Sequence, residues 1–293
     1  MYELIQLTDK CYYIQSPAKI GLVKIGEDEV CLIDSGNDKD AGRKVRQILD
    51  ANSWKLKAIY NTHSNADHIG GNRYLQNQTG CRIYAKGIEC DFARHTVLEP
   101  SFLYGGYPCK DLRHKFLLAQ ESNAEELTED VLPNGFEMID LKGHFFDMVG
   151  FRTDDVVYLA DCLSGRETLD KYCISFMYDV AEYIRTLERV KTMEAKIFVP
   201  AHAEATENIE RLVQYNIDKV YEIAERITDI CSEPICFENI LQRLFNDYGL
   251  AMNFEQYALA GSTVRSYLSW LKDKGSIDVI FEDNMLLWRK RAS

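Results

Sequence analysis

The stretch 61–71 constrains this chain more than any other part of its sequence. It reads Asn-Thr-His-Ser-Asn-Ala-Asp-His-Ile-Gly-Gly and directly follows the apolar run 56–60. An apolar run that gives way to polar residues and then to Gly-Gly predicts a strand, a loop and the start of a helix. His63, Asp67 and His68 would then project from the end of a rigid strand into one cleft. Because imidazole and carboxylate groups suit zinc or iron, the pattern predicts a metal site.

Three further motifs follow along the chain, each with a candidate ligand after an apolar run. Gly143-His144 follows the run 136–141, Asp161 ends the run 156–161, and His202 ends the run 197–202. Together with the stretch 61–71, these motifs resemble the metallo-β-lactamase superfamily in order and spacing, and the first one resembles its HxHxDH signature. The motifs use four of the six histidines of the chain. The resemblance extends over about residues 1–230.

The resemblance implies a four-layer αββα sandwich (the metallo-β-lactamase fold), in which two sheets pack face to face with helices outside. Strand and helix patterns alternate in both halves of the chain, which agrees with this mixed α+β and α/β class. The strands expected from the sequence are 11–15, 20–25, 30–34, 56–60, 136–141, 156–161 and 197–202, and the helices are 40–51, 69–76, 179–190 and 207–230. Asp34-Ser35-Gly36 matches a common family turn whose aspartate braces the ligand loops. A role for Asp34 as a helix cap is an equal alternative.

By the same resemblance, the metal ligands fall into two sites. The first would comprise His63, residue 65 and His144; the second would comprise Asp67, His68 and His202, with Asp161 between the two. Residue 65 is Asn65, where the family has its second histidine. An amide oxygen is a poorer zinc ligand than imidazole, so we expect one tightly bound zinc at the second site and a weaker one at the first. Iron or manganese are alternatives, and Asp67 is the expected catalytic residue that also orients the water.

The character of the sequence changes near residue 233, so we expect a domain at 1–230 and a C-terminal module at 233–293. Two helical stripes, at 237–245 and 264–271, precede a hairpin at 277–288. Three helices followed by a hairpin are typical of a winged-helix-like module. From residue 234 to 293 there are seven basic and seven acidic residues, too few basic ones for a helix that reads DNA. We favour a packing module that walls the active site or mediates homodimerisation.

Composition restricts the compartment and the partners. The net charge of −12 disfavours a nucleic-acid partner, because an acidic surface repels polyphosphate. Nine scattered cysteines without a C-x-x-C pair indicate reduced thiols, most of them buried, and Cys162 in particular is expected in the core. No apolar run is long enough for a membrane span and no signal peptide is recognised, so we expect a cytoplasmic protein with no membrane partner.

The leading functional hypothesis is a metal-dependent hydrolase of a small ester, thioester or lactone. Hydroxyacylglutathione hydrolases and lactonases share this motif order. The alternatives are a phosphodiesterase or nuclease of the same fold, an iron-dependent redox enzyme, and a catalytically degenerate binding or regulatory module. The variable segment 86–134 is expected to border the site, with Tyr104 and Tyr107 as candidate substrate contacts and no ligand role for His95 or His114.

Overall fold

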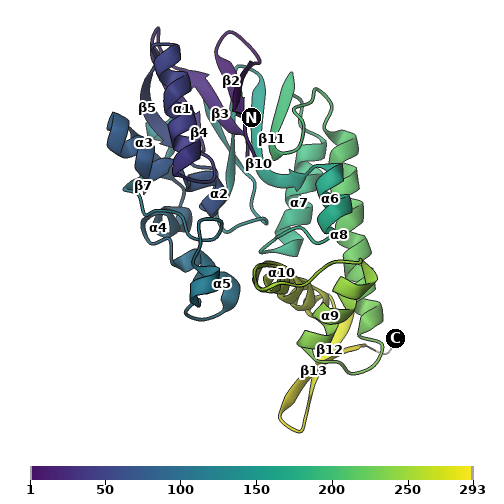
Figure 1. The fold of residues 1–293 in the computed structure, drawn as a ribbon. Helices are drawn as coiled ribbons and strands as arrows, with labels where there is room; N and C mark the ends of the chain where they lie inside the picture. The colour runs from purple at the N-terminus through teal and green to yellow at the C-terminus, as the bar shows by residue number, and fades with distance from the viewer. Residues whose placement is uncertain (1, 292–293) are drawn as a thin grey trace.

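The structure is a computed structural model that describes residues 2–291, and two β-sheets packed face to face form its centre (Figure 1). The first sheet has its strands in chain order: β1 (Glu3–Gln6), β2 (Cys11–Gln15), β3 (Ile20–Lys24), β4 (Glu29–Ile33), β5 (Lys55–Tyr60), β6 (Arg82–Ala85) and β7 (Ala124–Glu126). The second sheet has the order β11 (Ile197–His202), β10 (Val156–Ser164), β9 (Val149–Thr153) and β8 (Glu137–Asp140). Neighbouring strands run antiparallel from β1 to β4 and from β8 to β10, and parallel from β4 to β7 and between β10 and β11.

Helices cover the outer faces of both sheets, and further helices lie beyond the sheets. In chain order, the helices of the described residues are α1 (Lys39–Ala51), α2 (Ala66–Ile69), α3 (Asn72–Thr79), α4 (Ile88–Arg94), α5 (Leu98–Tyr104), α6 (Arg166–Tyr172), α7 (Val180–Lys191), α8 (Glu210–Ile230), α9 (Phe237–Asp247) and α10 (Phe254–Asp273). Two 3₁₀ turns, Lys110–Leu112 and Glu129–Val131, lie in the segment before β8. Helices α1 and α3 lie over the first sheet, and α7 and α8 over the second (Figure 1). The predicted four-layer αββα sandwich is confirmed.

Alternating side chains of the central strands build two separate parts of the core. In β4, Val30 and Leu32 join the cluster beneath α1, whereas Cys31 and Ile33 face the second sheet. This follows from the period of two along a strand, which sends successive side chains to opposite faces. The strand is therefore buried on both faces, which explains why its sequence is continuously apolar.

The expected helix at 69–76 is wrong, because the chain forms α2 and α3 with a break at Gly70-Gly71. The backbone of this segment bonds to the turn after β4: Ser35 N donates to His68 O at 2.8 Å, and Gly71 N donates to Gly36 O at 3.3 Å. A Cβ atom on Gly71 would lie 2.3 Å from the Ser35 oxygen, so the close approach requires glycine. As a result, Asp67 and His68 lie on a short helix rather than on a loop.

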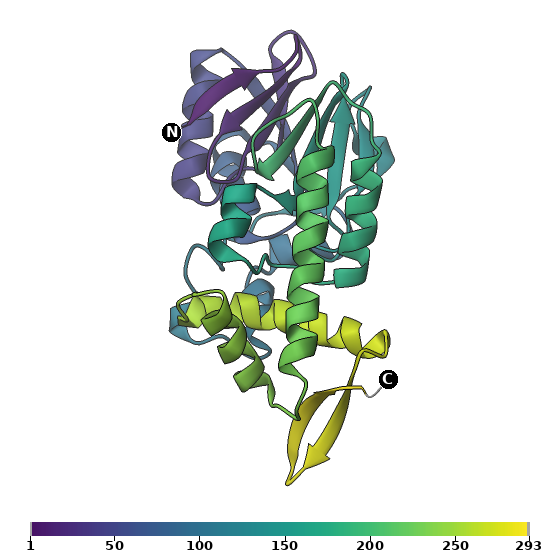
Figure 2. The same ribbon diagram turned by 90° about the vertical axis from the view of Figure 1, so that its right-hand side faces the viewer.

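Residues 233–291 form α9, α10 and the hairpin of β12 (Ile277–Glu282) and β13 (Met285–Lys290), at the end of the molecule below the two sheets (Figure 2). Only two helices precede the hairpin in this segment, one fewer than expected, and α8 packs against both of them. One hydrophobic cluster runs from Leu159 of β10 through α7 and α8 to Tyr267 of α10. The winged-helix-like identity of the segment stays a prediction.

The cysteines and the lengths of the helices test two further expectations. All nine cysteines lie within residues 2–291, and none of them is paired in a disulfide. Cys162 is fully buried in the core, as expected, whereas Cys109 is exposed and departs from the expectation of burial. Across residues 2–291, no helix combines the length and the apolar composition that crossing a bilayer requires.

Candidate metal centre

The structure brings the seven sequence-predicted ligands together at one edge of the sandwich. They come from five elements: His63 and Asn65 from the loop after β5, Asp67 and His68 from α2, His144 from the loop between β8 and β9, Asp161 from β10, and His202 from the end of β11. Two groups have ligand atoms within 4.8 Å of one another, one of Asp67, His68, Asp161 and His202, and one of His63, His144 and Asp161. Asp161 is shared, as the resemblance implies. The ligand roles themselves stay a prediction.

The group with Asp67 is tightly arranged. Nε2 of His202 lies 3.3 Å from Asp67 Oδ2 and 3.2 Å from Asp161 Oδ2. Nε2 of His68 lies 3.1 Å from Asp161 Oδ1 and 3.8 Å from Asp67 Oδ2. Two carboxylates and two imidazoles therefore converge on one point with their ligand atoms facing inward.

In the other group, Asn65 supplies an oxygen in place of an imidazole. Its Oδ1 lies 3.2 Å from His144 Nε2, which in turn lies 3.7 Å from Asp161 Oδ2. The rings of His63 and His144 meet edge to face with centroids 5.1 Å apart. The structure thus places an amide oxygen beside His63, His144 and Asp161, the ligands expected for the first site, where the resemblance left a doubtful ligand.

Asp34 decides which ring nitrogen two of the histidines present. Its Oδ2 lies 2.8 Å from His68 Nδ1 and accepts a hydrogen bond from the Thr62 hydroxyl at 2.7 Å. The hydroxyl oxygen of Thr62 lies 3.0 Å from His63 Nδ1, so it accepts that N–H while donating to Asp34. Both imidazoles consequently direct Nε2 into the site. Between the two alternatives for Asp34, the structure favours the brace, since the cap of α1 is Asp38.

Left-handed backbone at two ordinary residues helps to aim the ligand side chains. Asp34 has φ 64° at the end of β4, and Ala160 has φ 49° directly before Asp161. The pairing of β10 with β11 shifts register between Tyr158 and Ala160. Such strain persists only where surrounding contacts hold it, and it gathers at functional sites.

Without a metal, the charges of the site balance one another. Burial disfavours the cations of His68 and His202, but Asp161 and Asp67 outweigh it; they raise the pKa of His68 above its usual range and that of His202 to about 10. Burial lowers the pKa of both His63 and His144, so these rings are uncharged at neutral pH. Burial also opposes ionisation of Asp161, yet His202 and His68 hold its pKa well below the usual range.

A metal ion fits this donor set. His63 Nε2, His68 Nε2 and Asp161 Oδ1 are buried and have no hydrogen-bond partner among the described residues. Buried polar atoms are rarely left without a partner, and a cation held among these three would satisfy all of them, including the His68 and Asp161 atoms that face each other at 3.1 Å. Imidazole with carboxylate is also the donor set of catalytic zinc and iron sites.

A cavity of about 350 Å³ opens beside the cluster and is lined by His144, Asp161 and His202. Its other walls come from the segment after α6, including Ile174 and Phe176, and from α10, including Leu259. Helix α10 therefore forms part of the wall of the site. Tyr104 and Tyr107, the candidate substrate contacts, are exposed and do not line this cavity.

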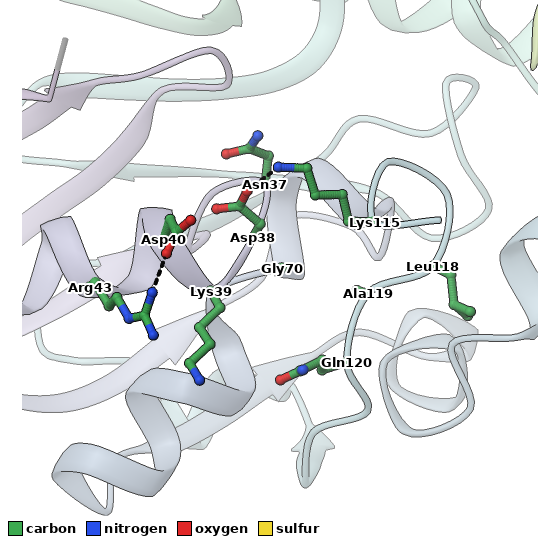
Figure 3. Close-up of a pocket in the computed structure, with 10 residues that line it drawn as sticks. All are labelled: Asn37, Asp38, Lys39, Asp40, Arg43, Gly70, Lys115, Leu118, Ala119 and Gln120. Atoms are coloured by element: carbon green, nitrogen blue, oxygen red, sulfur yellow. Dashed lines mark hydrogen bonds and ion pairs between the residues drawn. The ribbon is translucent and has the colours of Figure 1, made fainter. Parts of the chain in front are cut away.

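A different hollow, of about 310 Å³, lies at the start of α1 (Figure 3). Lys115 spans it from the segment 86–134 and forms an ion pair with Asp38 at 2.8 Å. Its lining contains none of the seven predicted ligands.

Sequence reasoning missed two buried glutamates, Glu89 and Glu99, both in the variable segment 86–134. Glu89 Oε2 accepts hydrogen bonds from Ser64 N, at 3.0 Å, and from the Ser64 hydroxyl. Its other oxygen, Oε1, accepts a hydrogen bond from Asp147 N at 2.9 Å. It thereby joins the loop of His63 to the loop of His144. No signal in the sequence marks it, because a lone glutamate in a helix is usually exposed.

Replacing Glu89 with glutamine is expected to lower the free energy of unfolding of the metal-free protein by about 1–3 kcal/mol, since the new amide NH₂ would face a buried donor. Burial raises the pKa of Glu89 to about 7, above its value of about 4.3 in an unfolded chain. The stabilisation of the folded state by the Glu89 carboxyl group is thus fully present below about pH 4.3 and is lost as the pH rises through about 7. The difference between wild type and Glu89→Gln should therefore be larger at pH 5 than at pH 8.

Urea unfolding at the two pH values, with a chelator present, checks this expectation. The exposed Glu129→Gln in the same segment is the control and should change stability by less than about 0.5 kcal/mol. A difference for Glu89→Gln that grows with pH would contradict the argument.

Known proteins share both sequence and fold with this chain. Residues 15–202, more than half of it, match the family model described as the metallo-beta-lactamase superfamily. A hydroxyacylglutathione hydrolase of Methylococcus capsulatus is 46% identical over 39 residues, which are 13% of this chain and 15% of that relative. One of Bradyrhizobium is 48% identical over 44 residues, 15% of this chain and 17% of the relative. Both likenesses are therefore confined to a short part of each protein.

Solved structures resemble nearly the whole chain. A beta-lactamase domain protein from Burkholderia ambifaria superposes with a TM-score of 0.75 at 15% identity, covering 99% of this chain and 94% of the other. A metallo-beta-lactamase family protein from Thermus thermophilus gives a TM-score of 0.71 at 14% identity, covering 99% and 98%. At this identity the likeness shows the fold alone.

Proposed function

Because the chain belongs to the metallo-beta-lactamase superfamily, we propose that it is a metal-dependent hydrolase of a small ester, thioester or lactone. The observation that carries the proposal is that Asp161, His144 and His202 together line a cavity of about 350 Å³. A cavity whose wall contains such a cluster of polar groups is the arrangement expected of a small-molecule site.

In this proposal Asp67, His68, Asp161 and His202 would hold the tighter metal, and His63, Asn65, His144 and Asp161 the weaker one. A bound zinc supplies a water nucleophile at neutral pH and polarises a carbonyl oxygen. Asp67 would orient that water by accepting a hydrogen bond from it. Without a metal, burial opposes ionisation of Asp67, but the cations of His68 and His202 keep its pKa low; with a metal bound, the charge of the ion would take over that role.

The cavity favours a small, mostly uncharged acyl group. Its lining includes the apolar side chains of Ile174, Phe176 and Leu259 and the acidic Glu255, and it contains no Lys or Arg. A phosphodiester bound there would lack a cationic partner other than the metal. The short likeness to hydroxyacylglutathione hydrolases also supports a thioester as one substrate class.

Phosphodiester hydrolysis is the second candidate, because a separate hollow of about 590 Å³ that is also lined by His202 includes Lys19, Arg166 and Arg211. Two acidic residues, Glu167 and Glu204, line the same hollow and offset that charge. Lys19 is in addition buried and donates to the Ala203 carbonyl, so it is not free to bind a phosphate.

Turnover of p-nitrophenyl esters, an S-acyl thioester and a simple lactone, measured against bis-p-nitrophenyl phosphate, tests the proposal. We expect kcat/KM for the best acyl substrate to exceed that for the phosphodiester by at least about tenfold, since the cavity has no cation for the diester. His202→Ala should lower it by at least about 100-fold while the protein stays folded. A faster phosphodiester reaction, or a fully active His202→Ala variant, would reject the proposal.

A further inference from the structure

Glu99 is a buried carboxyl group that lies outside every sequence motif and contacts Asn65. Its side chain is only 4% exposed, and its Oε1 accepts a hydrogen bond from Asn65 Nδ2 at 3.0 Å. The other end of the same amide, Asn65 Oδ1, lies 3.2 Å from His144 Nε2. The Asn65 amide is therefore held between Glu99 on one side and the predicted ligands on the other.

This contact determines which end of the amide faces the ligand cluster. An amide nitrogen only donates hydrogen bonds and an amide oxygen only accepts them. Turning the Asn65 amide by 180° would set Oδ1 against the Glu99 oxygen and aim N–H groups at the site, where they would repel a cation. Burial and the charge of Asp67 raise the pKa of Glu99, yet one Glu99 oxygen can accept the N–H whether the group is ionised or protonated.

The position of Glu99 is in turn fixed by aromatic packing. Phe102 lies three residues further along α5, on the same helix face as Glu99. Its ring centroid is 6.0 Å from that of Phe145 and 5.1 Å from that of Phe146, the two residues that follow His144. Helix α5 is thus packed against the loop that carries His144.

We propose that Glu99 is a positioning residue that holds the Asn65 amide with its oxygen toward His63, His144 and Asp161, and so makes Asn65 a metal ligand. The pair replaces the histidine that the family has at this place. An acceptor oxygen behind a ligand also polarises it through the hydrogen bond, which strengthens the amide oxygen as a donor to a metal. The inference rests on the proposed function only in requiring that the cluster binds metal.

Zn²⁺ titration of the full chain against a chromogenic chelator, with Co²⁺ absorption spectra as a second readout, tests the proposal. The variants are Glu99→Leu, Glu99→Gln, Asn65→Ala and the double variant Asn65→Ala/Glu99→Leu. Glu99→Leu should weaken the weaker Zn²⁺ site by about 10–100-fold and leave the tighter site within about twofold. Glu99→Gln, which retains an acceptor oxygen, should recover part of the loss. On the Asn65→Ala background, Glu99→Leu should have no further effect.

Several results would overturn the inference. These are an equal loss at both sites, a Glu99→Leu effect that persists in the Asn65→Ala background, equal losses for Glu99→Gln and Glu99→Leu, or a wild type that binds one Zn²⁺ only. Thermal unfolding checks each variant, and if Glu99→Leu does not fold, the same cycle is run with Glu99→Gln. Ester hydrolysis by the wild type is measured in parallel. Its absence would reject the hydrolase while leaving the metal-binding result to decide the role of Glu99.

Discussion

Replacing Asp161 with asparagine is expected to abolish tight metal binding and to lower kcat/KM for an acyl substrate by at least about 1,000-fold. Asp161 is the only residue that belongs to both ligand groups. Its Oδ2 lies 3.2 Å from His202 Nε2 and 3.7 Å from His144 Nε2, and its Oδ1 lies 3.1 Å from His68 Nε2. Asparagine keeps the shape but removes the charge, and about 4 kcal/mol of lost stabilisation corresponds to about 1,000-fold.

Metal content after dialysis, measured together with steady-state kinetics, checks this expectation. Asp155→Asn, at an exposed carboxylate in the turn before β10, is the matched control and should retain both metal and activity. Two tightly held metals in Asp161→Asn would show that the carboxylate is not shared between the sites.

Removal of the Asp34 side chain should weaken metal binding without touching a ligand. In the native protein, Asp34 Oδ1 accepts a hydrogen bond from Thr62 N at 2.8 Å, and Asp34 Oδ2 lies 2.8 Å from His68 Nδ1. Asp34→Ala leaves both of these nitrogen donors without an acceptor. Loss of such a partner behind a metal ligand typically costs 10–100-fold in metal affinity, so we expect a drop of about that size. Breaking this buried contact should also lower the free energy of unfolding by about 3–5 kcal/mol.

Asp34→Asn is a milder change at the same position. Asparagine tolerates the left-handed backbone there and can still accept from Thr62 N, but its NH₂ would face the buried N–H of His68, so it should lower the free energy of unfolding by about 1–3 kcal/mol, less than Asp34→Ala. It no longer provides a carboxylate for His68, so metal affinity should still fall. Asp38→Asn, which keeps a side-chain oxygen to cap α1, is the control in zinc titration and urea unfolding. Unchanged zinc affinity in Asp34→Ala would disprove the bracing role.

Local sequence patterns were sufficient to predict most of the strands and the residue types at the site, but not β6, β7 or β9. The segments 11–15 and 197–202 coincide with β2 and β11, and 56–60 falls within β5, because apolar strands buried on both faces carry a strong local signal. His144 and His202 could be placed at strand ends because each follows such a run. The chemistry of imidazole and carboxylate then predicted a metal site before any distance was known.

The break between α2 and α3 shows where local patterns stop being sufficient. Helical spacing at 69–76 favours one helix, but backbone hydrogen bonds from Ser35 and Gly36 compete for the same peptide groups. These partners lie more than 30 residues away in the sequence. Tertiary contact overrides the local preference there, as it commonly does for short helices.

The sequence by itself determined the family and its layered fold, through residue type, short-range periodicity and the order of motifs that it shares with that family, whereas the ligand roles stay a prediction. The tertiary structure alone decided that Asp34 braces His68, that α10 walls the cavity, and that Glu99 faces Asn65. Glu99 and Asn65 are 34 residues apart and share no periodic pattern. A buried carboxyl group has a meaning only through the donor it meets, and that donor is set by how distant segments pack.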